Sequence, residues 1–410
     1  MKKTLLIVAT LDTKGREAGY LRDRVRELGL VPLVMDVGTL GTASIDHDIP
    51  AGEVARTTGM DPSKIGTAIL SRSEAVEAMQ KGGSLIARQL YKQGKIDGIL
   101  GLGGGTGTAI ATAIMRSLPF GMPKLVVSTV ASRDVRQYVG TRDIVMFHSV
   151  ADLLGSNHFV RFLLEQAARA VCGMVEAGAG LERTAPMIAV TAYGLNSRCA
   201  MHAEPLLERK GYEMIGFHAN GVGGMAMEEM VGEGLVEAVL DLTCHEIADE
   251  MFGGYCRGIG RDRFRVAGER GVPVLLAPGG LDNAVFSPFY PMPDTLKGRR
   301  RHDHDDRFCI RMESGEMVAF AAIIAERLKE SRGPSCVLIP SGGWSEADKP
   351  GGELYDPEVD RVFTMELRKL LGEEFPIEEM EVHISDPAFA QRAVEIIDEM
   401  VRTKRSRFGS

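Results

Sequence analysis

Short apolar runs alternate with segments of helical periodicity along the whole chain. In the first half, the runs that predict buried strands are Leu5 to Ala9, Val31 to Val37, Ile96 to Leu102, Lys124 to Thr129 and Ile144 to Phe147. Helices are predicted between them at Glu17 to Leu28 and at Ser73 to Gln93, the second with an interruption at Gly82-Gly83. This alternation is typical of a parallel sheet with helices on both faces.

The same pattern starts again in the second half. A long apolar helix is predicted from Asn157 to Ala177, and a charged, proline-containing linker from Leu181 to Pro186. The strands predicted after it are Met187 to Thr191, Tyr212 to His218, Ala238 to Thr243, Val272 to Ala277, Ser335 to Ile339 and Glu379 to Ile384. The sequence therefore predicts an α/β fold of two Rossmann-like, doubly wound parallel-sheet lobes, residues 1–180 and 186–410, joined by the long helix and the short linker.

Composition and charge narrow the class of protein. The net charge of −8 argues against a general nucleic-acid surface, which is usually basic. No apolar stretch reaches the ~18 residues that a membrane span needs. The six cysteines show no C-x-x-C or zinc spacing, and most lie within or beside apolar runs. Buried, reduced thiols in a cytoplasmic protein are the expectation.

A glycine-rich stretch follows the strand predicted at Ile96 to Leu102. It consists of Gly103, Gly104, Gly105, Thr106, Gly107 and Thr108, and an alanine-rich helix is predicted after it from Ala109 to Arg116. Glycine lets the backbone approach an anion, and a helix N-terminus favours negative charge. The stretch matches neither G-x-G-x-x-G, because position 108 is Thr, nor the P-loop. It predicts phosphate binding, with a tight turn that binds no ligand as the alternative.

Other polar residues stand where predicted strands of the first lobe end. They are Asp12, Thr13, Lys14, Asp36, Ser128 and Thr129. The carboxyl ends of parallel strands share one edge of the sheet, where open α/β sheets bind ligands. A nucleotide fits these residue types, with Asp36 on the ribose and Lys14 beside a phosphate. The alternatives are a turn or capping residue for Asp36 and a solvated surface lysine for Lys14.

In the second lobe the candidates for acid–base chemistry are Asp241, His218 and His245, which lie at or just after strand ends. No spacing among them fixes a catalytic set or a metal site, and Asp241 could instead cap a helix or turn. Gly221 to Gly224 is a second candidate for anion binding. The charge run Arg299 to Arg307 is interpreted first as an exposed loop, then as an arginine and histidine lid over an anion, and last as a metal site.

Several motifs, in order along nearly the whole chain, carry a family resemblance. They are Ala9 to Gly15, Gly101 to Thr108, Val127 to Ser132, Tyr138 to Thr141, Phe217 to Gly224, Leu240 to Thr243 and Asp356-Pro357. In them the sequence resembles the uncharacterised family that includes the ATP-binding N-terminal domain of the tomato tobamovirus-resistance protein. The resemblance implies two Rossmann-like lobes, an ATP site in the first, and self-association, but no known reaction. The run Arg301 to Arg307 departs from the family pattern, with Asp303, Asp305 and Asp306 where less acidic residues are usual.

The sequence thus leads to one main hypothesis and two alternatives. The main hypothesis is a cytoplasmic protein that binds ATP with Mg²⁺, holds the phosphates on Gly103 to Thr108, and forms a homo-oligomer. The first alternative is a small-molecule enzyme, a phosphotransferase or ATP-dependent ligase, with a small anionic substrate between the lobes. The second is a nucleotide-gated protein-interaction module. The sequence does not distinguish ATP hydrolysis from binding alone.

Overall fold

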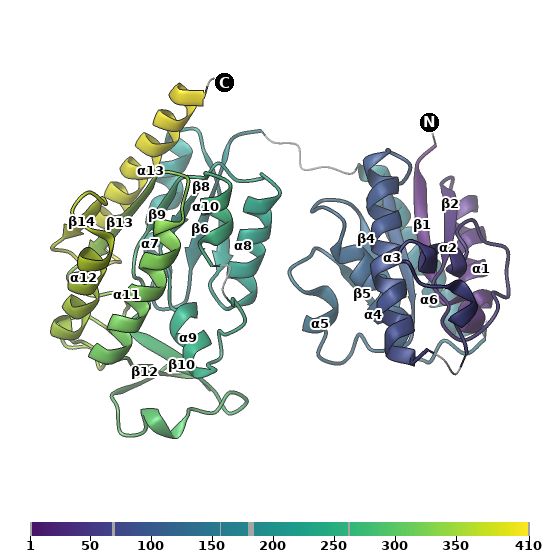
Figure 1. The fold of residues 1–410 in the computed structure, drawn as a ribbon, viewed down its shortest axis with the longest axis horizontal. Helices are drawn as coiled ribbons and strands as arrows, with labels where there is room; N and C mark the ends of the chain where they lie inside the picture. The colour runs from purple at the N-terminus through teal and green to yellow at the C-terminus, as the bar shows by residue number, and fades with distance from the viewer. Residues whose placement is uncertain (1, 68–69, 156, 179–183, 261–262, 409–410) are drawn as a thin grey trace. The chain divides into compact units, whose positions relative to one another are not determined.

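The chain forms two compact units, Met1–Glu182 and Arg183–Ser410. The computed structural model describes residues 2–67, 70–155, 157–178, 184–260 and 263–408. Positions 181–183 of the predicted linker therefore lie outside the described residues. Each unit has a parallel sheet between layers of helices (Figure 1). The predicted fold class, two Rossmann-like α/β lobes, is confirmed.

The sheet of the first unit has five parallel strands in the order β2-β1-β3-β4-β5. The strands are β1 (Thr4–Ala9), β2 (Val31–Asp36), β3 (Gly98–Gly103), β4 (Lys124–Ser128) and β5 (Val145–His148). The helices are α1 (Leu11–Glu27), α2 (Ala51–Arg56), the 3₁₀ helix η1 (Pro62–Lys64), α3 (Arg72–Lys92), α4 (Gly105–Arg116), α5 (Arg136–Val139) and α6 (His158–Ala177). The long helix predicted before the linker is α6.

Two apolar layers hold this unit together. On one face of the sheet, α1 and α6 pack on strand residues such as Leu5 and Leu100, and α6 buries Leu164 and Val171 there. On the other face, α2, α3 and α4 cover strand residues such as Val8. The long helix α6 thus packs within the first unit, as one layer of its core.

The glycine pair in α3 does not interrupt the helix, contrary to the prediction. A Cβ on Gly82 would lie 2.1 Å from the Val54 carbonyl oxygen, and one on Gly83 would lie 2.4 Å from Cδ1 of Ile114. The two glycines therefore let α3 pack closely on α2 and α4. Their cost in helix propensity is offset by this tertiary contact.

The strand order places a ligand crevice at a defined position. From β1 the chain moves outward to β2 and then returns to the opposite side of β1 as β3. The connections after β1 and β3 therefore leave the sheet in different directions. Such a switch point, at the carboxyl ends of the strands, is where open α/β sheets bind ligands.

The second unit repeats this order with one strand more. Its sheet, β14-β13-β9-β8-β6-β7, consists of β6 (Met187–Ala192), β7 (Glu213–His218), β8 (Ala238–Asp241), β9 (Val274–Leu276), β13 (Ser335–Pro340) and β14 (Ile377–Met380). Its helices are α7 (Ser197–Arg209), α8 (Val222–Gly232), α9 (Glu246–Phe252), α10 (Arg265–Glu269), η2 (Asp294–Leu296), α11 (Ser314–Lys329), α12 (Pro357–Leu371) and α13 (Pro387–Phe408). The switch point of this sheet lies between β6 and β8.

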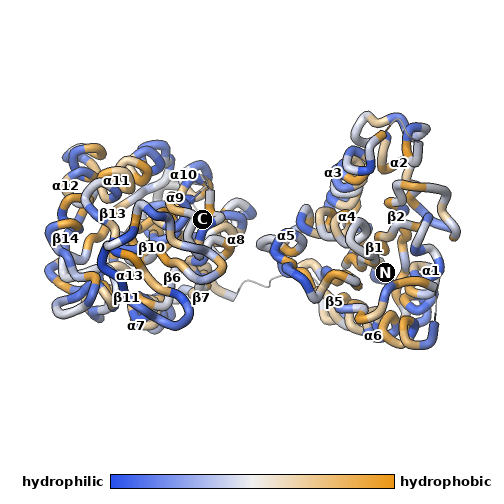
Figure 2. Tube along the Cα trace, turned by 90° about the horizontal axis from the view of Figure 1, so that it is seen from below, coloured by the Kyte–Doolittle hydropathy of each residue, from blue (hydrophilic) through white to orange (hydrophobic). Residues whose placement is uncertain are grey.

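The two faces of the second sheet are covered by different helices. On one face α7 and α13 pack on strand residues such as Val190 and Leu240, and on the other α11 and α12 enclose Trp344 and Phe363. The helix α13 continues to Phe408, and Arg402 pairs there with Asp398 at 3.0 Å. Figure 2 shows the apolar strands inside each unit and hydrophilic residues on the outer turns of the helices. Within the described ranges, no helix is long and apolar enough to cross a membrane.

A small antiparallel sheet in the second unit was not predicted. It consists of β10 (Asn283–Phe286), β12 (Phe308–Arg311) and β11 (Arg301–Asp303), in the spatial order β10-β12-β11. The interpretation of Arg299 to Arg307 as a loop is therefore wrong in part, because the segment forms β11 and the turn into β12. A strand of three residues made of arginine, histidine and aspartate carries no apolar alternation that sequence reasoning could detect.

Candidate functional site

The candidate site of the first unit lies at the switch point between β1 and β3. Ala9 and Leu102 are register partners at the ends of these strands. A Cβ placed on Gly107 would lie 3.0 Å from the Leu102 carbonyl oxygen and 3.8 Å from Oγ1 of Thr10. The turn after β1 and the glycine-rich stretch after β3 are therefore neighbours, as the sequence predicted for the two strand ends.

The helix α4 begins at Gly105, four positions before the predicted start at Ala109, and Gly104 is its N-cap. Thr106, Gly107 and Thr108 thus lie in the first helical turn. As a glycine, Gly104 has no side chain that could cap this helix. The Thr108 N–H donates to the Gly104 carbonyl at 2.8 Å. The N–H groups before it have no partner within the helix, which leaves them open to an anion.

The four glycines of the stretch lie in different surroundings, so they are not all explained by the same requirement. A Cβ on Gly103 would come within 2.5 Å of the Gly107 Cα and 2.9 Å of the Thr108 nitrogen, so close contact of strand and helix demands Gly103. A Cβ on Gly104 would meet only Oγ1 of Thr129, at 3.7 Å, and one on Gly105 would meet nothing within 4 Å. A tight turn explains Gly103 and Gly107, whereas Gly104 and Gly105 leave open space at the helix N-terminus.

Two of the predicted hydroxyls are structural. Thr108 and Ser128 are fully buried, and their oxygens are 2.7 Å apart. The Ser128 hydroxyl also accepts a hydrogen bond from the Val130 backbone at 3.1 Å. The pair fixes α4 to the loop after β4, and it leaves the half-buried Thr106 and Thr129 nearer to solvent.

An arginine that the sequence analysis did not consider lies at this helix N-terminus. Arg72 Nη2 donates to Oγ1 of Thr106 at 3.0 Å. Arg72 is the first residue of α3, which is fixed by a capping box between Ser71 and Glu74. Because 34 residues separate Arg72 from Thr106, no local motif could have predicted the contact.

The two predicted carboxylates brace the backbone. Asp36 is 4% exposed, and its Oδ1 accepts from the nitrogens of Leu11 at 3.0 Å and Gly38 at 2.9 Å. Burial raises the pKa of Asp36. These contacts favour the alternative in which Asp36 is a turn residue. Asp12 Oδ2 accepts from the backbone of Thr39 and Leu40, at 3.1 and 2.8 Å.

Thr13 and Lys14 lie in the first turn of α1, which begins before the helix predicted from Glu17. The hydroxyl of Thr13 is 3.1 Å from that of Thr10. Lys14 leaves helical geometry, with φ −123° and ψ 20°, and its ammonium donates to the carbonyl of Leu153. Lys14 is therefore half-buried and tied to the segment after β5, which is different from a freely solvated surface lysine.

In the second unit, Asp241 belongs to a fully buried ion cluster. It accepts from Thr191 Oγ1 and from Arg263 Nη2, both at 2.7 Å. Arg263 Nε also pairs with Glu246 at 3.1 Å, and its Nη1 lies 3.8 Å from Glu228. Burial raises the pKa of Glu228 to about 7. A fully buried, ion-paired Asp241 serves the fold, and it has no access to a substrate.

His245 is poorly placed to act as a base. It is fully buried and stacked on Tyr193, with ring centroids 4.0 Å apart. Its Nε2 contacts the Ala219 carbonyl and its Nδ1 lies 3.4 Å from Asp249. Burial alone lowers the pKa of His245, but Cys256 and Asp249 outweigh it and raise that pKa well above its usual value. An imidazolium whose two nitrogens face acceptors has no free lone pair.

His218 is exposed and stays a candidate for acid–base chemistry, whereas the second glycine stretch is not free for an anion. Desolvation, and then the positive charges of His245 and Arg307, lower the pKa of His218. The backbone nitrogen of Gly221 donates to Glu246 at 2.6 Å, and that of Gly223 donates to Asn220 at 3.0 Å. The prediction of an anion site at Gly221 to Gly224 is therefore wrong, because the protein's own Glu246 occupies it.

Comparison with known proteins places the chain in a family. The N-terminal domain of the uncharacterised protein family UPF0261 matches residues 3–179, and the C-terminal domain of that family matches residues 185–401. The chain belongs to the UPF0261 family. The resemblance stated from the motifs is thereby confirmed.

Relatives in the UPF0261 family come from bacteria and a plant. A UPF0261 protein of Clostridium tetani is 37% identical over 395 residues, covering 95% of this chain and 97% of the relative. The ToMV resistance protein Tm-1(GCR237) of Solanum lycopersicum is 33% identical over 413 residues, covering 95% of this chain but 54% of the relative. Among solved structures, an esterase domain from Rhodothermus marinus has a TM-score of 0.32 at 14% identity, covering 54% of this chain and 89% of that chain. That score supports no inference.

The charge run of this UPF0261 chain is neutralised by nearby carboxylates. The pairs are Arg299 with Glu316, Arg300 with Asp356, Arg301 with Asp303, His302 with Glu353, and Arg307 with Asp305. These pairs fix the β11–β12 hairpin and attach it to α11 and α12, which disfavours a lid that presents arginines to an anion. In the described part of the chain, no group of three or more His, Cys, Asp or Glu side chains is placed to hold a metal.

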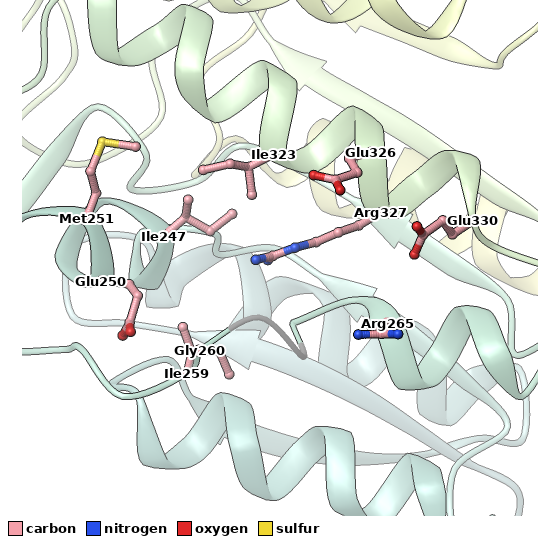
Figure 3. Close-up of a pocket in the computed structure, with 10 residues that line it drawn as sticks. All are labelled: Ile247, Glu250, Met251, Ile259, Gly260, Arg265, Ile323, Glu326, Arg327 and Glu330. Carbon is pink, nitrogen blue, oxygen red and sulfur yellow. The ribbon is translucent and has the colours of Figure 1, made fainter.

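The second unit also contains a pocket of about 650 Å³, which the sequence did not predict. It lies between α9, α10 and α11 (Figure 3). Its apolar lining residues are Ile247, Met251, Ile259 and Ile323, and its charged ones are Glu250, Arg265, Glu326, Arg327 and Glu330. In the close-up the side chain of Arg327 extends from α11 across the pocket towards Ile247.

A second buried cluster leads to a prediction on pH. Arg311 contacts Asp282, Asp348 and Asp360, at 4.0 Å and 3.4 Å for the first two. Burial, and then the charge of Asp348, raise the pKa of Asp282 to about 6 from 3.8. Between these values the folded chain binds more protons than the unfolded chain, so this group makes the free energy of unfolding fall as the pH rises.

Asp282→Asn is therefore expected to flatten the pH dependence of stability. The asparagine keeps the shape of the protonated acid and does not titrate. Chemical denaturation of the parent and variant from pH 4.5 to 7 measures the difference in the free energy of unfolding. Parallel curves over that range would show that Asp282 does not titrate there.

Proposed function

We propose that the first unit of this UPF0261 chain binds ATP, with its phosphates on the N-terminus of α4. The observation that carries the proposal is an uncapped helix N-terminus at the switch point, where Gly104 and Gly105 leave open space. The family resemblance supports ATP as the nucleotide. The proposal concerns binding and does not require hydrolysis.

The neighbouring side chains have distinct roles in this proposal. The backbone N–H groups of the first turn bind phosphate oxygens, and Arg72 adds a charged donor beside Thr106. Mg²⁺ accompanies the phosphates as an oxygen-binding cation. Asp12 is the carboxylate suited to it. Its Oδ1 accepts from the exposed Thr13 hydroxyl at 3.3 Å, a contact that a cation could replace.

Arg72→Met is expected to weaken ATP binding at least about tenfold, because a hydrogen bond from a charged group contributes ~1.5–3 kcal/mol. Titration calorimetry with ATP and Mg²⁺ measures the dissociation constant. Arg88→Met is the matched control, since Arg88 is an exposed arginine on the same helix, and it should bind ATP as the parent does. Equal affinity of Arg72→Met and the parent would remove Arg72 from the site.

A small-molecule enzyme is the second candidate function, and the pocket of the second unit favours it. Its volume of about 650 Å³ falls within the ~300–1,000 Å³ typical of ligand sites. A phosphotransferase or an ATP-dependent ligase would need such a pocket for its second substrate. ATP turnover that depends on an added metabolite would distinguish this enzyme from a protein that only binds nucleotide.

A further inference from the structure

The segment between β5 and α6 is attached to the proposed ATP site at two points. The Ser149 nitrogen donates to the Ser128 carbonyl at 3.2 Å, and Ser128 in turn contacts Thr108 of α4. At the other end of the segment, the Lys14 ammonium donates to the Leu153 carbonyl. One anchor therefore comes from the strand end beside α4, and the other from the first turn of α1.

The segment between these anchors is strained and exposes apolar side chains. Val150 has a φ of 58°, a left-handed conformation that a β-branched residue rarely adopts. Val150 is 68% exposed and Leu154 is 72% exposed, whereas Leu153 between them is buried in the core. A strained backbone persists only where its surroundings hold it, so the anchors matter for this conformation.

Lys14 is the anchor that a nucleotide can remove. Its ammonium now binds a neutral carbonyl oxygen, and a phosphate oxygen is a stronger, charge-assisted acceptor. Lys14 follows Thr13, whose hydroxyl contacts Thr10, and the Thr10 hydroxyl lies beside Gly107 of α4. The lysine side chain is flexible, and its ammonium is a compact point charge that can change partners.

We propose that Lys14 couples the nucleotide to the segment Ser149–Leu154. This inference rests on the proposed ATP site. When phosphate binds, Lys14 exchanges the Leu153 carbonyl for a phosphate oxygen, and the strained turn at Val150 is released. Nucleotide binding then makes this segment, which carries two exposed apolar side chains, less ordered. A nucleotide-gated interaction module requires such a link between nucleotide and surface.

Hydrogen exchange measured by mass spectrometry tests the coupling on the full chain. In the parent, saturating ATP with Mg²⁺ should raise the exchange rate of amides in the segment about tenfold, the factor expected when a hydrogen bond from a charged group is lost. Lys14→Met should exchange at this higher rate without ATP and show no further rise with it. Arg16→Met, an exposed residue two positions on, should behave as the parent does.

Calorimetry on the same samples distinguishes a failure of the proposed coupling from a failure of the proposed ATP site. If the parent binds ATP but exchange in the segment is unchanged or slower, the coupling is wrong and the ATP site stands. If the parent does not bind ATP, both proposals fail. If Lys14→Met without ATP exchanges as slowly as the parent, Lys14 does not hold the segment and the coupling is again overturned.

Discussion

Replacing Arg263 by methionine is expected to lower the free energy of unfolding by about 3–5 kcal/mol, the usual cost of breaking a buried ion pair. Arg263 is fully buried and is the positive charge that Asp241, Glu246 and Glu228 face. Methionine has a similar length but no charge, so the carboxylates would stay buried without their partner. They would then have to take up protons or draw water into the core.

Denaturant unfolding of the parent and Arg263→Met measures this loss. The control is Arg368→Met, which removes an arginine paired with Glu379 on the surface, where the two side chains are 46% and 44% exposed. Exposed ion pairs contribute about 0–1 kcal/mol, so the control should change little. Similar losses of unfolding free energy in both variants would show that the buried ion pairs of Arg263 stabilise the second unit no more than an exposed pair does.

Gly104→Asp is expected to have opposite effects on stability and on ATP binding. An aspartate at an N-cap that lacks a side-chain acceptor should stabilise α4 by roughly a few tenths of a kcal/mol relative to glycine. The same carboxylate would occupy the N–H groups proposed for phosphate and repel it. Losing two or more charge-assisted hydrogen bonds corresponds to at least about a 100-fold weaker affinity.

Gly104→Ala is the matched control for this substitution. Its Cβ would have only Oγ1 of Thr129 near it, at 3.7 Å, which is ordinary van der Waals contact. Alanine can neither cap the helix nor repel an anion, so ATP binding should stay close to that of the parent. A loss of binding in both variants would point to steric disturbance and not to competition for the N–H groups.

The sequence predicted the two parallel sheets because buried parallel strands are continuous apolar runs between turns. It missed the early start of α4, since glycine and threonine are poor helix formers and Gly105 to Thr108 adopt the helix only in the packed unit. It also missed β10, β11 and β12, because these strands have only three or four residues and β10 pairs with β12 across the long segment between them. Self-association and the cytoplasmic location stay predictions of the sequence.

For the site, the sequence could predict which segments meet at the edge of the sheet, but it could not predict which side chains contact one another. The pattern grouped Thr13, Lys14 and the glycine stretch at one edge, because carboxyl ends of parallel strands meet there. It could not show that Asp241 faces Arg263, 22 residues away, or that Arg72 reaches Thr106. Burial and pairing turned Asp241 and His245 from catalytic candidates into parts of the core.

Titration of the full chain with ATP and Mg²⁺, for the parent and for Gly104→Asp, tests whether the N-terminus of α4 binds the phosphates of ATP. We expect saturable binding to the parent, binding at least about 100-fold weaker to Gly104→Asp, and a variant no less stable than the parent. Equal affinity of a folded Gly104→Asp would contradict the placement of phosphates on α4. Absence of binding to the parent would contradict the ATP site itself.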